Sequence, residues 1–403
     1  MAPPIGLLKA EAPGDPLFRR LAVAPDYAAL SGGAILATWG ARSVPVITAA
    51  NNKNSADEVP SLCYDRSLPW VGLPYPAMDV VWCPFKKGNS YATFLTACRS
   101  CPLQMWDLDD ASLRASYCCY NAAGMLAYPH STLWSRHRTL VAAGYGGSED
   151  NIHVRLYDVL REGSTVVSSY RSPCSKGIVS ALSDGPAPCQ EKLLLAGFMR
   201  SGNVDIVDTR HCGAAAVLRG LRSGVAQVSA HPTAEHMVYA AGRLGDKRIV
   251  CWDTRKCNQL LATFEREVRT QQPVHFGFVQ RTDTEAPRVD LVSATHDGGV
   301  LVFDEAAAAA KEVTATAREP RRVGVDLGPT AGLAVLDTNG VIAVTVGEKR
   351  YAVQDRCEAN TDSPGTMRKP AKRSRDLFEG HDLESDEDSE IGRTAGGIAV
   401  LSV

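Results

Sequence analysis

The sequence predicts an all-β protein, a seven-bladed β-propeller of the WD40 type with degenerate first and last blades. Strand-like runs of 5–7 residues, rich in β-branched and aromatic types, are separated by Gly, Asp and Ser, which is typical of strands and not of helices. A run that ends in an apolar residue followed by Asp recurs at Asp107, Asp158, Asp208, Asp253 and Asp304, with 45 to 51 residues between successive Asp positions. This period is slightly longer than the ~40–45 residues of a typical WD repeat, as expected if some loops are enlarged.

The residue before each of these Asp residues has a predicted structural role. Two repeats hold a Trp-Asp pair, at Trp106 and Trp252. We expect the large side chain to pack between neighbouring blades and the carboxylate to accept hydrogen bonds in the tight turn after the third strand. The predicted structural positions are Trp106, Asp107, Tyr157, Asp158, Asp208, Trp252, Asp253, Phe303 and Asp304.

Further strand-like runs complete each repeat. The Asp-containing runs are preceded by apolar runs at 91–97, 139–144, 192–197, 237–242 and 289–294, and earlier runs occur at 79–83 and 225–230. The run 113–117 follows Asp107 as a fourth strand. Residues 18–39 are interpreted as a degenerate first blade, and residues 333–346, with a hairpin turn at 337–340, as the start of a last one.

The two ends of the chain carry a different pattern. Residues 356–393 are poor in apolar side chains and contain a basic block, 368–375, and an acidic block, 382–390, so we expect disorder. The basic block is either a nuclear localisation patch or a solvated charge run. The apolar run 397–403 is expected to return as the third strand of the last blade, and a run near 5–8 to close the ring. The predicted organisation is an N-terminal segment with a possible ring-closing strand (1–16), the propeller (17–354), a disordered insertion (355–395) and the returning strand (396–403).

Composition argues against several other classes of protein. No run approaches the ~18 apolar residues of a membrane helix, and we expect neither secretion nor a membrane partner. The 12 cysteines are scattered and are interpreted mainly as free thiols in a reducing compartment; the pair Cys98 and Cys101 lacks the second half of a zinc site and is expected in a hairpin turn. No phosphate-binding loop, metalloprotease motif or nucleophile elbow occurs. We therefore expect no enzyme, no metal, no cofactor and no small-molecule substrate.

At the level of individual residues, the chain resembles the telomerase Cajal body protein family. The resemblance rests on residues 96–107, 113–116, 120–121, 242–255 and 266–272, and extends over about 78–302. It implies a WD protein that binds the CAB box of H/ACA-type small Cajal body RNAs and of telomerase RNA, together with telomerase or H/ACA ribonucleoprotein components. It also implies a nuclear location, in the Cajal body or an equivalent body. The usual Gly-His turn reads Gly220-Leu221 here, so the buried His network of regular WD blades is not expected.

Candidate RNA-binding residues fall in the connections that share one face of a propeller. They are Arg99, Tyr120, Tyr145, Arg200, Arg243, Lys247, Arg266, Arg269, Gln271 and Gln272. A guanidinium can pair with phosphate or guanine and stack on an unpaired base, and aromatic rings add base stacking. For any one of them the alternative is a structural role, such as an ion pair of Arg266 with Glu267.

The body of the chain is nearly neutral. The net charge is −2, and residues 355–403 hold 11 acidic and 7 basic side chains, so attraction for nucleic acid must come from a local patch. The alternative function is a protein-interaction scaffold, such as a ligase adaptor or an assembly factor, without direct RNA recognition. A contiguous positive rim favours RNA, whereas an exposed apolar patch favours the scaffold.

Overall fold

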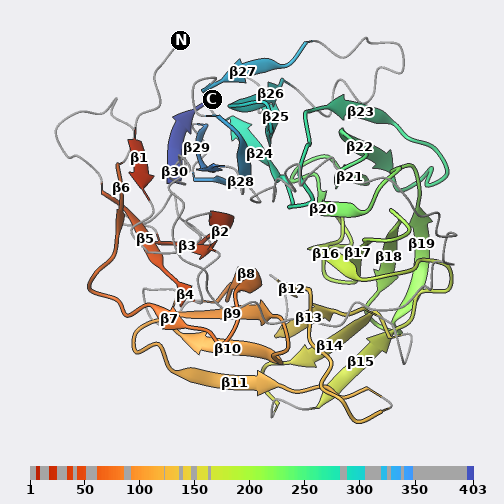
Figure 1. Ribbon diagram of the computed structural model, residues 1–403. Helices are drawn as coiled ribbons and strands as arrows, with labels where there is room; N and C mark the ends of the chain where they lie inside the picture. Colours follow the sequence, from red (N-terminus) through yellow and green to blue (C-terminus); the bar gives the residue numbers. More distant parts are fainter. Residues whose placement is uncertain are drawn as a thin grey trace, which may run out of the picture. The chain divides into compact units, whose positions relative to one another are not determined.

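Figure 1 shows the computed structural model of the chain. The structure describes residues 6–9, 18–24, 34–39, 43–50, 61–85, 92–121, 123–135, 139–146, 152–161, 165–281, 288–304, 319–324, 328–336, 340–347 and 397–403. The chain separates into two compact units, one formed by Met1–Glu348 with Ala395–Val403 and the other by Lys349–Thr394. All described residues lie in the first unit, so the predicted insertion at 355–395 lies outside them.

The described residues of the first unit form seven four-stranded antiparallel sheets around a ring, which confirms the predicted seven-bladed β-propeller. The first strand of each blade lies toward the centre of the ring and the fourth toward the outside (Figure 1). We call the four strands a, b, c and d in that order. Every regular element in this part of the chain is a strand, and none of its segments is a helix that could span a membrane.

The strands of the blades follow the chain in order. The first three blades are β2 (Phe18–Val23), β3 (Ala34–Trp39), β5 (Val46–Ala50) and β6 (Ser61–Tyr64); β8 (Ala77–Trp82), β9 (Thr93–Cys98), β10 (Leu103–Asp107) and β11 (Leu113–Tyr117); β12 (Ser131–Trp134), β13 (Leu140–Gly144), β14 (Val154–Asp158) and β15 (Val166–Tyr170). A separate pair, β4 (Ser43–Val44) and β7 (Val71–Gly72), lies beside the first blade. The first blade thus extends well past residue 39, where the sequence pattern weakens.

The other blades repeat this order. They are β16 (Val179–Asp184), β17 (Leu193–Phe198), β18 (Val204–Asp208) and β19 (Gly213–Leu218); β20 (Val225–Ala230), β21 (Met237–Gly242), β22 (Arg248–Asp253) and β23 (Ala262–Glu265); β24 (Phe276–Arg281), β25 (Arg288–Ala294), β26 (Val300–Phe303) and β27 (Arg321–Val323); β28 (Thr330–Val335), β29 (Val341–Val346), β30 (Gly397–Ser402) and β1 (Gly6–Lys9).

The seventh blade combines strands from opposite ends of the sequence. Strand β30 pairs with β29 from Val341↔Ser402 to Val346↔Gly397, and on its other side with β1, where Gly6 faces Val400. The C-terminal run is therefore strand c of this blade, and the N-terminal run is strand d. Such pairing closes the ring, because no inner strand of the blade keeps an open edge.

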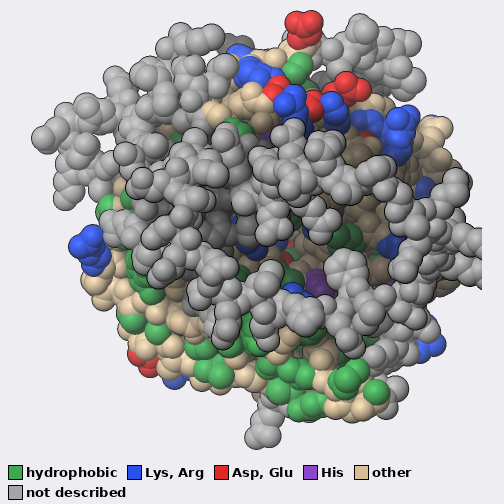
Figure 2. All heavy atoms as spheres, viewed as in Figure 1, with side chains coloured by type: hydrophobic (Ala, Val, Ile, Leu, Met, Phe, Trp, Pro, Cys, Tyr) green, Lys and Arg blue, Asp and Glu red, His purple; other side chains and the backbone are tan. Residues whose placement is uncertain are grey.

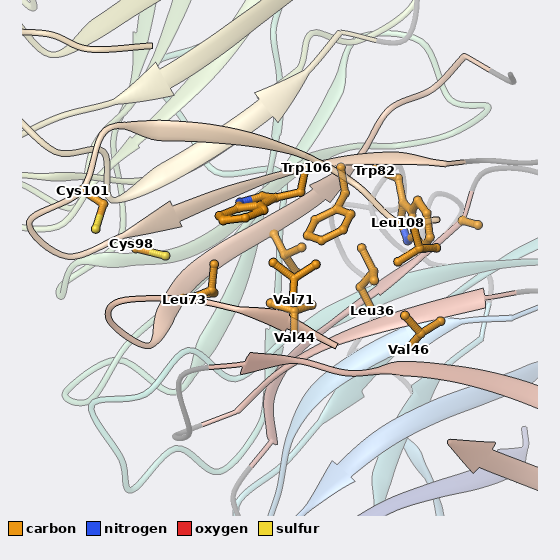
Figure 3. Packing of buried hydrophobic residues seen from close by; sticks show 14 residues of the cluster. Leu36, Val44, Val46, Val71, Leu73, Trp82, Cys98, Cys101, Trp106 and Leu108 are labelled. Atoms are coloured by element: carbon orange, nitrogen blue, oxygen red, sulfur yellow. The ribbon is translucent and has the colours of Figure 1, made fainter. Parts of the chain in front are cut away.

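Among the described residues, seven apolar clusters form the core, one at each junction between neighbouring blades. Figure 3 shows the cluster between the first two blades, where Trp82 and Trp106 face Leu36 and Val46. Trp252 is fully buried between the fourth and fifth blades, and its indole N–H donates to the carbonyl of Arg219 at 2.9 Å. Tyr157 and Phe303 occupy the same kind of junction.

The Asp that follows each of these positions organises the turn after strand c. The carboxylate accepts the backbone N–H two residues later at Asp107 (3.0 Å), Asp158 (3.1 Å), Asp208 (2.9 Å) and Asp253 (2.9 Å). This short-range bond is the one that Asp side chains favour in tight turns. Asp304 ends a described segment and is exposed.

Candidate nucleic-acid interface

The antiparallel order of each blade places two kinds of connection at one end of the ring. These are the turns between strands b and c and the connectors from strand d to the next strand a; together we call them the loop face. All ten candidate RNA-binding residues lie in these connections. Six of them meet where the fifth blade joins the sixth, and Arg200, Arg99, Tyr120 and Tyr145 lie on the blades before.

Arg243 holds two loops of this junction together. Its Nη1 donates to the carbonyl of Gln271 at 2.9 Å, and its Nε to that of Val225 at 3.3 Å. The side chain is half-buried, and burial lowers the pKa of Arg243. Both of these acceptors are neutral carbonyl groups. Arg243 thereby fixes the connector that presents Gln271 at the surface.

Arg266 lies below the surface and not on it. Only 3% of the residue is exposed, its Nη1 donates to Ser293 Oγ at 3.1 Å, and its Nη2 donates to the carbonyl of Gly242 at 3.3 Å. Burial lowers the pKa of Arg266 to about 9, although the charge of Asp246 opposes this. The expectation of a direct RNA contact does not fit this burial. Arg266 is a positioning residue that joins the fifth blade to the sixth.

The predicted pairing of Arg266 with Glu267 is replaced by a different one. Glu267 Oε2 lies 2.7 Å from Lys247 Nζ, and its Oε1 lies 3.1 Å from Arg269 Nε. The bonds from Lys247 and then Arg269 lower the pKa of Glu267. The side chains of both cations are largely exposed, at 60% and 68%. Close by, Gln271 is exposed, and the backbone N–H of the half-buried Gln272 donates to the Thr270 hydroxyl oxygen at 3.1 Å.

A second group of cations lies where the fourth blade meets its neighbours. The N–H of Ser201 donates to the carbonyl of Lys176 at 3.2 Å, so the turn that carries Arg200 touches the connector that carries Lys176. On its other side, the turn that carries Arg200 packs closely against the connector that carries Ser223. A Cβ added at Gly202, whose φ is +65°, would lie only 2.4 Å from the carbonyl oxygen of Ser223. Arg222 is exposed on that next connector. Sequence reasoning missed Lys176 and Arg222, because only the strand boundaries reveal that they face this end.

Polar anchors beneath the loops fix these connectors. Asp205 is completely buried and accepts hydrogen bonds from Tyr170 (2.7 Å), Ser172 (2.5 Å) and Ser175 (2.6 Å). In the next blade, Asp246 accepts the backbone N–H of Arg222 at 2.6 Å. Buried carboxylates that are fully hydrogen-bonded in this way hold loops rigidly.

Apolar and aromatic side chains are also exposed on the loop face. Tyr120 is 61% exposed and lies on a short ordered loop, in which the side-chain oxygen of Asn121 accepts the N–H groups of Ala123 (3.0 Å) and Met125 (2.8 Å). The tips of the b–c turns in the fourth and fifth blades carry Met199 and Leu244, both exposed. Exposed side chains of this kind provide flat or soft surfaces for unstacked bases.

Tyr145 does not belong to this exposed set. It is 2% exposed, its hydroxyl lies 2.8 Å from that of Tyr157, and the Arg155 guanidinium carbon lies 4.7 Å from the centre of its ring. Both rings belong to the cluster between the second and third blades. The expectation that Tyr145 offers a stacking surface to RNA is therefore at odds with the structure, because its ring is in the core.

Arg99 is exposed in the b–c turn of the second blade, between two cysteines. Cys98 and Cys101 are buried free thiols, and burial raises the pKa of Cys98 to about 12, with a further contribution from Cys101. Within the described residues, no group of three His, Cys, Asp or Glu side chains could hold a metal ion. Both cysteines belong to the apolar cluster between the first two blades, and Figure 3 shows them at one end of it.

The seven blades and the Trp-Asp positions define a WD-type β-propeller. This architecture, with its ordered loop face, points to a binding platform and not to an enzyme. The chain is similar to telomerase Cajal body protein 1 of Rattus norvegicus, with 27% identity over 209 residues, which is 51% of this chain and 36% of that protein. For the Mus musculus protein the identity is 26% over 244 residues, 58% of this chain and 43% of that protein. For the Homo sapiens protein the identity is 27% over 209 residues, which is 51% of this chain and 35% of that protein.

These homologues confirm the resemblance to the telomerase Cajal body protein family that the sequence motifs indicated. The matched region spans less than half the length of the curated relatives. A comparison with known protein-family profiles gives no match.

Proposed function

We propose that this chain is an RNA-binding WD-repeat protein that recognises the CAB box of H/ACA-type small Cajal body RNAs and of telomerase RNA. In this proposal it acts in the nucleus, in the Cajal body or an equivalent body, and supports ribonucleoprotein localisation or telomerase assembly. Its partners are these RNAs and the protein components of the H/ACA or telomerase particle. The names of the relatives and the chemistry of the loop face support this assignment.

The observation that carries the proposal is a row of cations on the b–c turns of the fourth and fifth blades and on the connectors before, between and after these blades. We call it the basic strip, and its members are Lys176, Arg200, Arg222, Arg243, Lys247 and Arg269. Hydrogen bonds link the segments that carry these cations. The N–H of Ser201, next to Arg200, donates to the carbonyl of Lys176, and the N–H of Arg243 donates to the hydroxyl of Ser223, next to Arg222. The N–H of Arg266 donates to the carbonyl of Lys247 at 2.9 Å, which links the strip to the connector that carries Arg269.

The charge and shape of the strip suit single-stranded RNA. Phosphate contacts provide affinity without sequence information, and base edges or stacking provide the discrimination. Met199 and Leu244 protrude beside Arg200 and Arg243, so an unstacked base can pack on an apolar side chain while the adjacent guanidinium binds its phosphate or edge. A protein of nearly zero net charge can bind RNA through such a local patch.

One observation favours a second candidate, the protein-interaction scaffold. Leu113, Leu160 and Val167 are exposed on the outer strands and c–d turns of the second and third blades. Figure 2 shows hydrophobic side chains gathered over this part of the ring, around β10, β11 and β15, whereas Lys, Arg, Asp and Glu side chains alternate over β23 and β27. Exposed apolar patches often mark protein interfaces.

Fluorescence anisotropy tests the RNA proposal, with the full chain and two RNA hairpins that differ only in the CAB box. The double variant Arg200→Gln/Arg222→Gln should weaken binding of both hairpins and reduce the salt slope by about 1.4, since each lost phosphate contact on single-stranded RNA contributes about 0.7. The matched control, Arg210→Gln/Arg255→Gln, removes the same charge from exposed sites at the opposite end of the fourth and fifth blades. Equal affinity of the unaltered protein for the two hairpins would exclude box recognition and favour the scaffold.

A further inference from the structure

Glu267 is an acidic side chain that lies between the last two cations of the basic strip. Its two carboxylate oxygens are each bound by one cation, Lys247 at 2.7 Å and Arg269 at 3.1 Å. These are two of the six cations on which the proposed RNA site depends. In the free protein, two cations of the strip are therefore already paired with a carboxylate on the same surface.

The backbone holds this carboxylate in a fixed place. The N–H of Glu267 donates to Thr295 Oγ1 at 3.2 Å, and the carbonyl of Glu267 accepts the N–H of His296 at 2.9 Å. Both partners lie in the b–c turn of the sixth blade, so the acid is anchored to the next blade while its side chain points back to the cations of the fifth blade and its connector. About 20% of the Glu267 side chain is exposed, which leaves the pair within reach of a ligand at the surface.

Two oxygens that share a negative charge and accept from Lys and Arg resemble the two free oxygens of an RNA phosphate. We infer that Glu267 competes with RNA phosphates for Lys247 and Arg269. The inference rests on the proposed function, since it concerns the same site. The exchange is feasible because an ion pair between exposed side chains is weak in water, so a phosphate can displace the carboxylate, but with a reduced net gain in affinity.

This competition has a functional consequence for selectivity. Phosphate contacts provide nearly all of the binding that is independent of sequence. By neutralising two cations in the free state, Glu267 lowers the affinity of the ring for any RNA. An RNA then has to make base contacts to remain bound, and RNAs that lack the recognised box dissociate at physiological salt.

The test replaces the acid without changing its size. Glu267→Gln should bind the box hairpin and the box-mutated hairpin more tightly, by about 3- to 10-fold at low salt, because its two cations bind phosphate without first releasing a carboxylate. Glu235→Gln is the control: it makes the same charge change on the a–b loop of the fifth blade, at the opposite end. Its affinities should match those of the unaltered protein.

A double-mutant cycle makes the test specific for the pair. In the unaltered protein Glu267 competes for Lys247, so Lys247→Gln should weaken RNA binding by a smaller factor than the same change does in the Glu267→Gln protein. In the Glu267→Gln background, the same Lys247→Gln change should remove about half of the gain on a logarithmic scale. Additive effects of the two substitutions would overturn the inference.

The outcomes separate this inference from the proposed function. If the unaltered protein discriminates the hairpins and Glu267→Gln binds no more tightly, only the competition is wrong. If Glu267→Gln loses affinity for the box hairpin alone, the carboxylate contacts a base and does not compete with phosphate. RNA binding by neither protein overturns both proposals. The melting temperature of Glu267→Gln should be unchanged, because its side chain bonds to the exposed cations Lys247 and Arg269.

Discussion

Arg243 Nη1 donates a hydrogen bond to the backbone carbonyl oxygen of Gln271, and the two atoms lie 2.9 Å apart. This bond joins the b–c turn of the fifth blade to the connector that leads into the sixth. The same guanidinium also reaches the carbonyl of Val225, at the start of strand a. One half-buried cation therefore sets the relative position of two loops that both carry residues of the basic strip.

The first prediction concerns this bond. Arg243→Lys keeps the positive charge, but an ammonium on a flexible stem lacks the planar fork that reaches both carbonyls. We expect faster amide hydrogen exchange in residues 268–272 and a loss of about 1–2 kcal/mol in affinity for the box hairpin. Arg255→Lys, on an exposed site of the same blade, should change neither quantity. Normal exchange together with normal affinity in Arg243→Lys would show that the bond does not position the connector.

The second prediction concerns Trp252, which is buried between the fourth and fifth blades. Trp252→Ala should reduce the free energy of unfolding by roughly 3–5 kcal/mol, because the cavity removes contacts with both blades. Trp252→Phe keeps much of this packing and leaves the Arg219 carbonyl without its donor, at a smaller cost of about 1–3 kcal/mol. Chemical denaturation measures both values. A Trp252→Ala protein with normal stability but no RNA binding would identify Trp252 as a base-stacking residue.

The third prediction concerns closure of the ring by β30. Val400 is fully buried in the cluster between the seventh and first blades, whereas Ser402 on the same strand is exposed. Val400→Asp should strongly lower the melting temperature, because it places an unpaired charge in that junction. Ser402→Asp, the matched control, should have little effect. Deletion of 368–390, which lies outside the described residues, should leave the melting temperature nearly unchanged if the sequence prediction of disorder is right.

The fourth prediction concerns pH. His275 is buried, and this burial, with the charges of Arg20, Arg266 and Arg243, lowers its pKa to about 3. In the unfolded chain a histidine titrates near pH 6.5. Between these values the unfolded state binds more protons, so the stability present above pH 6.5 is lost as the pH falls toward 3, at about 1.4 kcal/mol per pH unit.

His275→Gln cannot take up this proton. Between pH 6.5 and pH 4, its free energy of unfolding should therefore fall less steeply than that of the unaltered protein, when both are measured by chemical denaturation. The comparison of the two slopes cancels the carboxylates that titrate in both proteins. Parallel curves would show that His275 is accessible to protons in the folded state.

The repeat pattern predicted the fold because the physics of each blade is local. A strand that ends in a large side chain and Asp specifies both a residue for the blade junction and a turn, and Trp106, Tyr157, Trp252 and Phe303 all lie in such junctions. The first blade was harder to delimit, since β5 and β6 lack a Trp-Asp signal and the pattern gave only residues 18–39.

The candidate site was predicted less completely. The b–c turns and the d–a connectors of a propeller share one face, and this rule placed every candidate residue on such a connection. The rule could not distinguish side chains that point outward from side chains that point inward. Tyr145 and Arg266 are buried, whereas Lys176 and Arg222, which no motif marked, are exposed on the same face.

The sequence by itself determined the blade repeat, the residues at the blade junctions and the set of loops that share one face, because these depend on periodicity and on short-range turn chemistry. Only the tertiary structure decided which cations reach the surface and which partners they take. Glu267 pairs with Lys247, 20 residues earlier, and Arg266 bonds to Ser293, 27 residues later. Such contacts depend on how two blades pack against each other, and that packing follows from the closed ring and not from the spacing of residues along the chain.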